Sequence, residues 1–350
     1  MTSKYDGKSF RWGIWGTGTI AHAFAADIQA SYEMRVTAVC SRSLESAVEF
    51  KNKIGADHAF DDAAAFLSSS DFDAVYIATP NAMHVPQTLQ AIAAGKACLT
   101  EKPLTLDADG ASAIAAASQA HNVFAMEAMW SRFLPAIAAT REHIKAGRIG
   151  TVKRIEADLS YFREEDPQSR FFNPALGGGA AFDLGVYPVS LALSFLGLPD
   201  TVSGRWTKAK SGVDMRTEIT LSYANAEAQL SCGFDHDGKN QMLIEGTDGT
   251  ILIHAPFLKA QRLTIFSAKV RNSPLGPKSP GGLIGKVLNR LPLPGRTVEH
   301  HPFSGNGLQF QAQAVRDTLK RDEISSPIMP LEHSAAVASI VSTVLAKKPN

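Results

Sequence analysis

The sequence has few cysteines and almost no excess of charge. Its three cysteines, Cys40, Cys98 and Cys232, form neither a CxxC pair nor an even set for disulfides, which favours a reducing compartment, the cytoplasm. Lys and Arg number 35 against 34 Asp and Glu, so the net charge of +1 gives no general electrostatic attraction to a nucleic acid or an acidic membrane. We therefore expect neither as a partner.

Long uninterrupted apolar runs are also lacking. The first eleven residues are polar and contain no stretch typical of a signal peptide. The most apolar later stretch, residues 180–198, contains Asp183 and fits a buried helix better than a membrane span. With 45% hydrophobic and 20% charged residues, the 350-residue chain is typical of a globular protein of two domains.

The first third of the chain alternates between two patterns. Apolar runs predict strands at residues 12–14, 34–40, 74–78 and 97–100, and helices are expected at 20–28, 43–54, 85–94 and 107–119. Continuous apolar strands separated by helices indicate a parallel sheet covered on both faces, whose ligands bind at the carboxyl ends of the strands. The sequence therefore predicts a Rossmann domain over residues 1–125.

The rest of the chain has a different pattern. Apolar and polar residues alternate in 227–234, typical of a strand with one covered face. Further strands are expected at 151–162, 201–210, 215–223, 241–245, 250–254 and 262–270, and helices at 180–196, 309–321 and 332–346. This predicts an α+β domain over residues 126–350. Residues 270–298 are basic and rich in Pro and Gly, which fits a mobile surface insertion or else a lid or partner-docking loop.

A glycine-rich turn, GTGTIA at residues 16–21, follows the first strand and opens a helix. Gly16 permits the tight turn, Gly18 lets a pyrophosphate approach the backbone, and the helix start at Thr19 and Ile20 offers unpaired N–H groups. In this βαβ context the motif predicts dinucleotide binding.

The end of the second strand indicates which dinucleotide binds. An NAD site usually has an acidic residue there, whereas this chain has Ser41 and Arg42. A hydroxyl and a guanidinium suit a 2′-phosphate, so NADP is favoured over NAD. The alternative is that Arg42 is a solvated residue at a helix start.

Glu101, Lys102 and Pro103 close the fourth strand at the same edge. The proline keeps Lys102 out of helical geometry, and the apolar run before it favours partial desolvation of the amine beside a nicotinamide. The alternative is a surface lysine at a turn.

These motifs resemble those of the Gfo/Idh/MocA oxidoreductase family. The resemblance rests on GTGTIA, on ATPN at 78–81 with His84 after it, on EKP at 101–103, and on GGGAAFDLGVY at 177–187. The last segment and EAMWSRF at 127–133 are similar to the branch of dimeric trans-dihydrodiol dehydrogenases, which also oxidise D-xylose with NADP. The resemblance implies a Rossmann domain followed by an α/β domain with a large open, mainly antiparallel sheet, often used for dimerisation.

A second group of candidate residues lies in that later segment. Asp183 and Tyr187 are four residues apart and hence on one face of a helix. A phenol has a reference pKa of about 10, and a nearby Lys102 ammonium would favour its phenolate. We expect Tyr187 to take the alcohol proton while hydride leaves the same carbon, and the resemblance assigns Lys102 and Tyr187 as the catalytic pair, with Asp183 orienting a hydroxyl or Lys102. The alternative is a core tyrosine and a capping aspartate.

The remaining candidates rest mainly on the resemblance. It places Thr79, Pro80 and Asn81 beside the cofactor, with a structural role favoured for His84, and makes Trp130 and Arg132 substrate-pocket residues. Arg170 is a further candidate for contacting a polar substrate. No cluster of ligand residues predicts a metal site.

The expected activity is NADP-dependent oxidation of a secondary alcohol in a sugar, polyol or dihydrodiol, by a homodimer formed through the C-terminal sheet. Two alternatives stay open. One is a glucose–fructose oxidoreductase type enzyme that keeps its nucleotide, although the N-terminal arm here is short for that purpose. The other is a non-catalytic sensor that binds dinucleotide.

Overall fold

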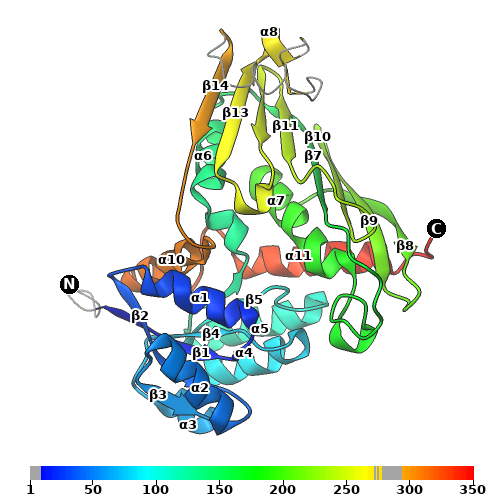
Figure 1. Cartoon of the computed structure of the whole chain (residues 1–350). Helices are drawn as coiled ribbons and strands as arrows, with labels where there is room; N and C mark the ends of the chain where they lie inside the picture. Colours follow the sequence, from blue (N-terminus) through cyan, green and yellow to red (C-terminus); the bar gives the residue numbers. More distant parts are fainter. Residues whose placement is uncertain (1–8, 272, 274–275, 278–293) are drawn as a thin grey trace. The chain divides into compact units, whose positions relative to one another are not determined.

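The computed structural model describes residues 9–271, 273, 276–277 and 294–350, which group into two compact units (Figure 1). The first unit comprises Met1–Phe133 and Ser304–Ser339, and the second comprises Leu134–Phe303 and Ile340–Asn350. The first unit is therefore longer than the sequence-based domain 1–125, and it includes a late segment that the sequence pattern assigns to the second domain. The physical reason is that hydrogen bonds connect Asn306 and Leu308 of this late segment to Asp27.

The first unit is built on a six-stranded sheet in the order β3-β2-β1-β4-β5-β6, with every neighbouring pair parallel. Its strands are β1 (Phe10–Trp15), β2 (Met34–Cys40), β3 (His58–Phe60), β4 (Ala74–Ile77), β5 (Ala97–Glu101) and β6 (Ala125–Ala128). Its helices are α1 (Thr19–Gln29), α2 (Leu44–Ile54), α3 (Ala63–Ser68), α4 (His84–Ala93), α5 (Ala108–His121) and α10 (Leu308–Lys320). The predicted Rossmann fold is confirmed.

The sequence fixes several helix ends through local hydrogen bonds. Ser43 Oγ accepts the Ser46 N–H at 3.2 Å at the start of α2, and Asp107 Oδ1 accepts the Gly110 N–H at 2.8 Å at the start of α5. Gly55 follows α2 with φ +69°, in the left-handed region that glycine adopts without strain. The strands β4 and β5 are buried throughout, as their continuous apolar runs predict.

A late segment of the chain packs against the first helix of this unit. Asp27, near the end of α1 and 3% exposed, accepts the backbone N–H of Asn306 at 2.9 and 3.0 Å and that of Leu308 at 2.9 Å. Arg316 of α10 forms an ion pair with Glu33. These bonds hold α10 beside α1 (Figure 1) and explain why residues 304–339 belong to the first unit.

The second unit is built on an eight-stranded sheet in the order β14-β13-β12-β11-β7-β10-β9-β8. Neighbouring strands are antiparallel except for β7 and β10, which are parallel. The strands are β7 (Val152–Ser160), β8 (Thr201–Lys208), β9 (Asp214–Tyr223), β10 (Ala226–Gly233), β11 (Met242–Gly246), β12 (Gly249–Ile253), β13 (Arg262–Ser267) and β14 (Arg296–His300). The predicted large, mainly antiparallel sheet is confirmed.

One face of this sheet is apolar and covered by helices. Ile155, Leu159, Ile244 and Ile251 share that face by strand register, and each is fully buried. The helices α6 (Pro135–Lys145) and α7 (Val186–Leu196) pack against it. The helix α11 (Leu331–Leu345) is shared by the two units, because the boundary between Ser339 and Ile340 lies within it. The opposite face, which we call the open face, carries alternate residues such as Glu156 and Gln229.

The segment 174–196 is long and apolar enough to be compared with a membrane span, but its apolar window is 72% buried. That burial fits the predicted core helix. Most of the basic segment 270–298 lies outside the described residues. Its described parts are the end of α8 (Ala268–Arg271), residues 273 and 276–277, and residues 294–298, which include the start of β14. The predicted insertion or lid and the predicted short N-terminal arm therefore concern parts of the chain that the structure does not describe.

Candidate functional site

The glycine-rich turn lies at the carboxyl end of β1. Gly16 has φ +114°, its N–H donates to the Cys40 carbonyl at 2.8 Å, and a Cβ on it would lie 2.5 Å from the Ala78 carbonyl oxygen. Gly18 is exposed, and a Cβ there would meet no atom within 4 Å. Only the first glycine is thus demanded by the fold, whereas the second faces open space at the start of α1.

The start of α1 is exposed and has no side-chain cap. Thr19 begins the helix, Ile20 follows it, and the N-cap Gly18 supplies no side-chain acceptor for the first backbone N–H groups. Unsatisfied N–H groups at a helix start, together with the helix dipole, favour a bound phosphate. A dinucleotide phosphate fits this turn, because the space beside Gly18 is open and the helix start has no side-chain cap.

The neighbouring strand ends bring the other cofactor candidates to the same edge. Ser41 and Arg42 follow β2, and among the described residues the exposed Arg42 side chain makes no ion pair or hydrogen bond. Thr79, Pro80 and Asn81 follow β4, which neighbours β1 on its other side. The β1/β4 pair is where the strand order reverses, the usual position of a ligand crevice in such sheets.

A buried hydrogen-bond network supports the backbone of Lys102. Tyr76 of β4 donates its hydroxyl hydrogen to Glu101 Oε1, and Glu101 Oε2 accepts the Lys102 N–H at 3.2 Å. Burial raises the pKa of Glu101 to about 7, against the opposing effects of Tyr76 and Lys102. In this structure the Glu101 carboxyl therefore lies inside the unit, while Lys102 itself is partly exposed.

His84 connects the loops after β4 and β5. It is 1% exposed, with Nδ1 at 2.8 Å from the Pro103 carbonyl oxygen and Nε2 at 2.8 Å from the Thr79 carbonyl oxygen. Burial lowers its pKa, and a neutral imidazole donates only one hydrogen. The neutral ring therefore donates to only one of the two carbonyls at a time, and His84 lies between the Lys102 loop and the Thr79 loop.

Trp130 and Arg132 lie in the buried 3-10 turn η2 (Trp130–Phe133) of the first unit. The Arg132 side chain is fully buried, and its NH1 donates to the Ile328 carbonyl at 2.8 Å and to His333 Nδ1 at 2.9 Å. These contacts attach η2 to the residues around the start of α11. The sequence did not indicate this internal role.

In the second unit Arg170 lies beside Asp183, and Tyr187 follows Asp183 by four residues. Asp183 lies in the π turn η4 (Ala181–Gly185), Tyr187 follows in α7, and Arg170 NH1 lies 3.7 Å from Asp183 Oδ1. Asp214, 4% exposed, accepts the Ala181 N–H at 2.7 Å and so fixes the start of this segment. Burial raises the pKa of Asp214. The sequence analysis missed Asp214, because its partner is 33 residues away and no local motif marks it.

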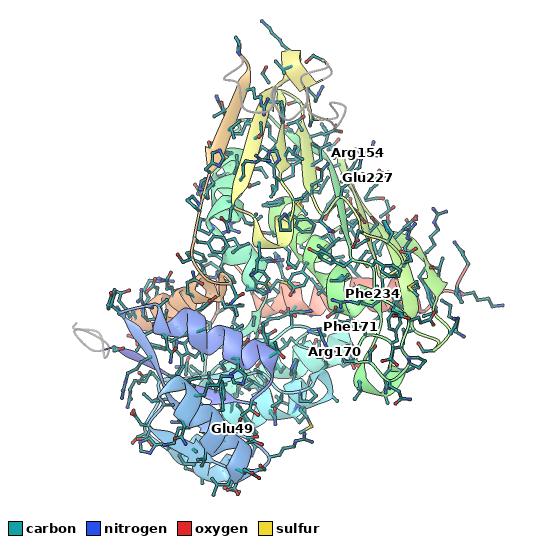
Figure 2. All side chains as sticks on the ribbon, in the orientation of Figure 1. Glu49, Arg154, Arg170, Phe171, Glu227 and Phe234 are labelled. Atoms are coloured by element: carbon teal, nitrogen blue, oxygen red, sulfur yellow. The ribbon has the colours of Figure 1, made fainter. Side chains whose placement is uncertain are left out.

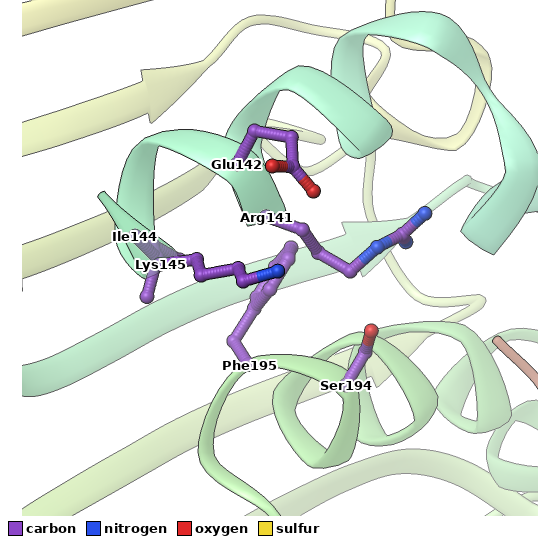
Figure 3. Close-up of a pocket in the computed structure, with 6 residues that line it drawn as sticks. All are labelled: Arg141, Glu142, Ile144, Lys145, Ser194 and Phe195. Atoms are coloured by element: carbon purple, nitrogen blue, oxygen red, sulfur yellow. The ribbon is translucent and has the colours of Figure 1, made fainter. Parts of the chain in front are cut away.

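Lys102 belongs to the first unit and Tyr187 to the second. Neither of two surface hollows contains a predicted site residue. One, of about 280 Å³, lies between α6 and α7 and is lined by Arg141, Glu142, Ile144, Lys145, Ser194 and Phe195 (Figure 3). The other is a shallow area along α2 that includes Glu49 (Figure 2). Among the described residues, no group of three or more His, Cys, Asp or Glu side chains is arranged to hold a metal ion.

Comparison with protein-family models gives two matches. Residues 10–129 match the oxidoreductase family with the NAD-binding Rossmann fold (GFO_IDH_MocA), and residues 137–252 match a GFO/IDH/MocA C-terminal domain. Together they cover most of both units.

Curated relatives cover nearly the whole chain. The chain is 30% identical over 341 residues to trans-1,2-dihydrobenzene-1,2-diol dehydrogenase of Xenopus tropicalis, covering 96% of this chain and 97% of the relative. It is 29% identical over 338 residues to the Mus musculus enzyme of that name, with 95% of each chain covered. It is 36% identical to scyllo-inositol 2-dehydrogenase (NADP(+)) IolU of Bacillus subtilis over 252 residues, 69% of this chain and 75% of the relative.

Solved structures share the fold. A levoglucosan dehydrogenase in complex with NADH and L-sorbose has a TM-score of 0.80 at 19% identity, covering 97% of this chain and 96% of that one. KijD10, a 3-ketoreductase from Actinomadura kijaniata in complex with NADP, has a TM-score of 0.77 at 23% identity, with 97% of each chain covered. With these matches over both units, the chain belongs to the Gfo/Idh/MocA family of oxidoreductases and is an NAD(P)-dependent dehydrogenase acting on CH–OH groups.

Proposed function

We propose that this chain is an NADP-dependent dehydrogenase that oxidises a secondary alcohol of a sugar, polyol or dihydrodiol, or reduces the corresponding carbonyl. The observation that carries the proposal is the convergence of Gly16, Gly18, Thr79 and Lys102 on the carboxyl edge of a Rossmann sheet at its β1/β4 reversal. The names of the curated relatives, dihydrodiol and inositol dehydrogenases, support the substrate class.

The dinucleotide would be held along that edge by loop residues. The pyrophosphate would lie over the start of α1, and the adenosine ribose beside the end of β2. The contacts come from Gly16, Gly18, Thr19, Ile20, Ser41, Arg42, Thr79, Pro80, Asn81, Glu101 and Lys102. Glu101 contributes by fixing the Lys102 backbone, in keeping with its buried carboxyl.

NADP is favoured over NAD because of Arg42. Its side chain is exposed beside the loop after β1 and makes no ion pair with the described residues, so a 2′-phosphate would be its counter-charge. Arg42→Ala should weaken NADP binding at least about tenfold more than NAD binding, as measured by fluorescence titration. An equal loss for both nucleotides would reject this assignment.

The proton transfer is assigned to Tyr187, assisted by Lys102. The bound nicotinamide supplies the hydride acceptor or donor. Tyr187 takes the hydroxyl proton of the substrate during oxidation and returns it during reduction, and the Lys102 ammonium favours the phenolate form. Asp183 orients a substrate hydroxyl or Lys102, and Trp130 and Arg170 contribute to the substrate pocket. The predicted pocket role of Arg132 is replaced by a supporting one, because its side chain is fully buried and bonded to Ile328 and His333.

A substrate screen with two variants tests the activity. The purified protein is given NADP or NAD with pentoses, hexoses, inositols and aromatic dihydrodiols, and NADPH or NADH absorbance is followed. Lys102→Ala and Tyr187→Phe should each lower kcat by about a hundredfold or more while nucleotide affinity stays within a few-fold. Near-wild-type turnover in both would remove the mechanism, and nucleotide that cannot be separated from the protein would favour the enzyme type that retains its cofactor.

We also propose that the enzyme is a cytoplasmic homodimer formed through the open face of the eight-stranded sheet. By register, the β7, β9 and β10 part of this face carries Glu156, Glu218 and Glu227 but also Arg154 and Arg216, and Glu156 is ion-paired with Arg154 and Glu218 with Arg205 of β8. The β13 and β14 part carries Arg262, Arg296 and His300. A two-fold contact that places one part of this face against the other would set Glu227 of one copy near these basic residues of the other. The three cysteines are free and buried, which suits a reducing compartment.

A further inference from the structure

Two arginines of the second unit lie against the same phenyl ring. The guanidinium carbon of Arg163 is 3.7 Å from the centroid of the Phe171 ring, and that of Arg170 is 4.2 Å from it (Figure 2 labels Arg170 and Phe171). A guanidinium over an aromatic ring is favourable and loses side-chain freedom before any ligand binds. Two cationic groups are therefore placed at fixed positions within a short distance of each other.

The ring is attached to the core of the second unit. Phe171 packs edge-on against Phe234, with centroids 5.7 Å apart, and the fully buried Phe234 also contacts Phe172 at 5.4 Å. The backbone N–H of Arg163 donates to the Phe234 carbonyl at 2.8 Å. The two arginines thus contact a ring, Phe171, that packs on Phe234 directly after β10 (Figure 2 labels both phenylalanines).

Within the described residues, the two arginines share one carboxylate partner, Asp183, which pairs with Arg170 and leaves Arg163 without an ion pair. The Arg163 side chain makes no hydrogen bond or ion pair with the described residues, and its Nε is buried without an acceptor. The Arg170 side chain is 68% exposed, and its contact with Asp183 is a long one of 3.7 Å. A partly buried guanidinium without an acceptor is costly, so an external anion would stabilise this arrangement.

The neighbouring charges do not cancel the pair. Glu165 accepts the Lys210 N–H, Asp166 accepts the Gln168 N–H at 2.9 Å, and Asp237 accepts the Phe162 N–H at 2.9 Å. Each of these carboxylates keeps its charge when it accepts a backbone N–H, but among the described residues only Asp183 forms an ion pair with either guanidinium. Near Phe234, the charge of Arg216 is matched by Asp235 at 3.1 Å, and Glu164 is exposed to solvent.

We propose that Arg163 and Arg170, stacked on Phe171, form a subsite for an oxoanion substituent of the substrate. The ligand class is a sugar or polyol that bears a carboxylate or a phosphoryl group, since planar guanidinium donors match both. The subsite adjoins Asp183 through Arg170, and Asp183 lies one helical turn before Tyr187. The inference rests on the proposed function, because it places the anionic group beside residues assigned to the reacting alcohol.

Steady-state kinetics with matched substrates test the subsite. D-glucuronate and D-glucose 6-phosphate carry the two kinds of oxoanion, and D-glucose is the neutral reference. For Arg163→Gln and Arg170→Gln, kcat/KM for an anionic sugar should fall at least about tenfold more than kcat/KM for D-glucose. Arg148 is an exposed arginine of the same unit after α6, and Arg148→Gln is the control. It should leave kcat/KM unchanged for the anionic sugars and for D-glucose. Equal losses on all three sugars would overturn the proposal.

Binding without turnover separates this inference from the proposed function. Calorimetric titration of the full chain with D-glucuronate, D-glucose 6-phosphate or inorganic phosphate should detect binding. A variant that combines Arg163→Gln and Arg170→Gln should lose this binding, and its thermal midpoint shows whether the variant is folded. Preference for one sugar identifies the oxoanion as carboxylate or phosphoryl. If D-glucose is oxidised but no anion binds, the subsite is wrong and the proposed function stands. If anions bind through these arginines but no alcohol is oxidised, the proposed function fails and the subsite stands.

Discussion

At the residue scale, the two glycines of the nucleotide turn have different physical roles. Gly16 combines a positive φ with a backbone carbonyl 2.5 Å from where its Cβ would be, so the fold itself requires glycine there. Gly18 has an extended backbone and open space around its Cβ position. Folding therefore does not require glycine at this position, which agrees with the proposed approach of a pyrophosphate to its backbone.

Alanine substitutions should separate these roles. Gly16→Ala should lower the free energy of unfolding by at least about 2 kcal/mol, because backbone strain and the clash with Ala78 act together. Gly18→Ala should leave stability nearly unchanged and weaken NADP binding several-fold, because a methyl group then stands between the backbone and the pyrophosphate. Chemical denaturation and nucleotide titration measure the two effects, and a stable Gly16→Ala protein would contradict the assignment.

His333 should make the first unit sensitive to acid. Burial, with a further contribution from Arg132, lowers the pKa of His333 to about 4 from the usual value of 6.5. Its Nδ1 accepts a hydrogen from Arg132, so protonation would break that bond and place two cations side by side. Because the unfolded chain binds the proton more readily, stability should be full above about pH 6.5 and should fall as the pH drops toward 4.

Thermal midpoints measured across that pH range check this expectation. His333→Asn keeps an acceptor near Nδ1 but removes the titration, so the midpoint of this variant should fall less steeply with acid than that of the wild type. Burial likewise lowers the pKa of His254 to about 4, so part of the pH dependence should remain. Identical slopes in the two proteins would exclude His333 as a source.

At the scale of elements, the carboxylate of Asp27 joins the first helix to a late one. It accepts two backbone N–H groups and the Asn306 side-chain amide at 3.3 Å, all at the start of α10. The N-cap residue of α10 is Gly307, which has no side chain of its own to do this. A residue 281 positions away thus supplies the missing cap.

Asp27→Ala should destabilise the protein by about 2–3 kcal/mol, because buried donors lose a charged acceptor. Asp62→Ala, which removes an exposed local cap at the start of α3, should cost about 1 kcal/mol or less and is the matched control. Urea denaturation followed by circular dichroism compares them. A smaller loss for Asp27→Ala than for Asp62→Ala would show that α10 is held by other contacts.

Most elements of the first unit were predictable, and the exceptions have physical reasons. The strand β3 has three residues, too few for a periodic pattern, and β6 contains the charged Glu127, which interrupts its apolar run. Glu127 is tolerated there because its Oε1 accepts the Leu104 N–H at 2.9 Å. In the second unit, the sequence pattern missed the edge strand β14 (RTVEH), because polar residues dominate it.

At the scale of the whole molecule, the charge pattern of the open face predicts a salt-sensitive dimer. Arg262 lies in its basic part, where its NH2 contacts His254 at 2.9 Å. Arg262→Glu should raise the dimer dissociation constant at least about tenfold and remove part of its salt dependence, as measured by light scattering at several protein concentrations. Arg148→Glu makes the same charge change away from this face and should leave the dimer intact. A wild-type protein that is monomeric at micromolar concentration would contradict the proposal.

The sequence by itself determined the elements whose causes are local. Apolar runs, caps and the GTGTIA turn gave the Rossmann sheet and its cofactor edge, because burial and backbone conformation act over a few neighbouring residues. Only the tertiary structure decided that residues 304–339 join the first unit, that Glu101 is turned inward to Tyr76, and that Arg163 stacks on Phe171 beside Arg170. Each of these depends on a partner brought close by folding, and a single sequence carries no local signal of which distant partner that is.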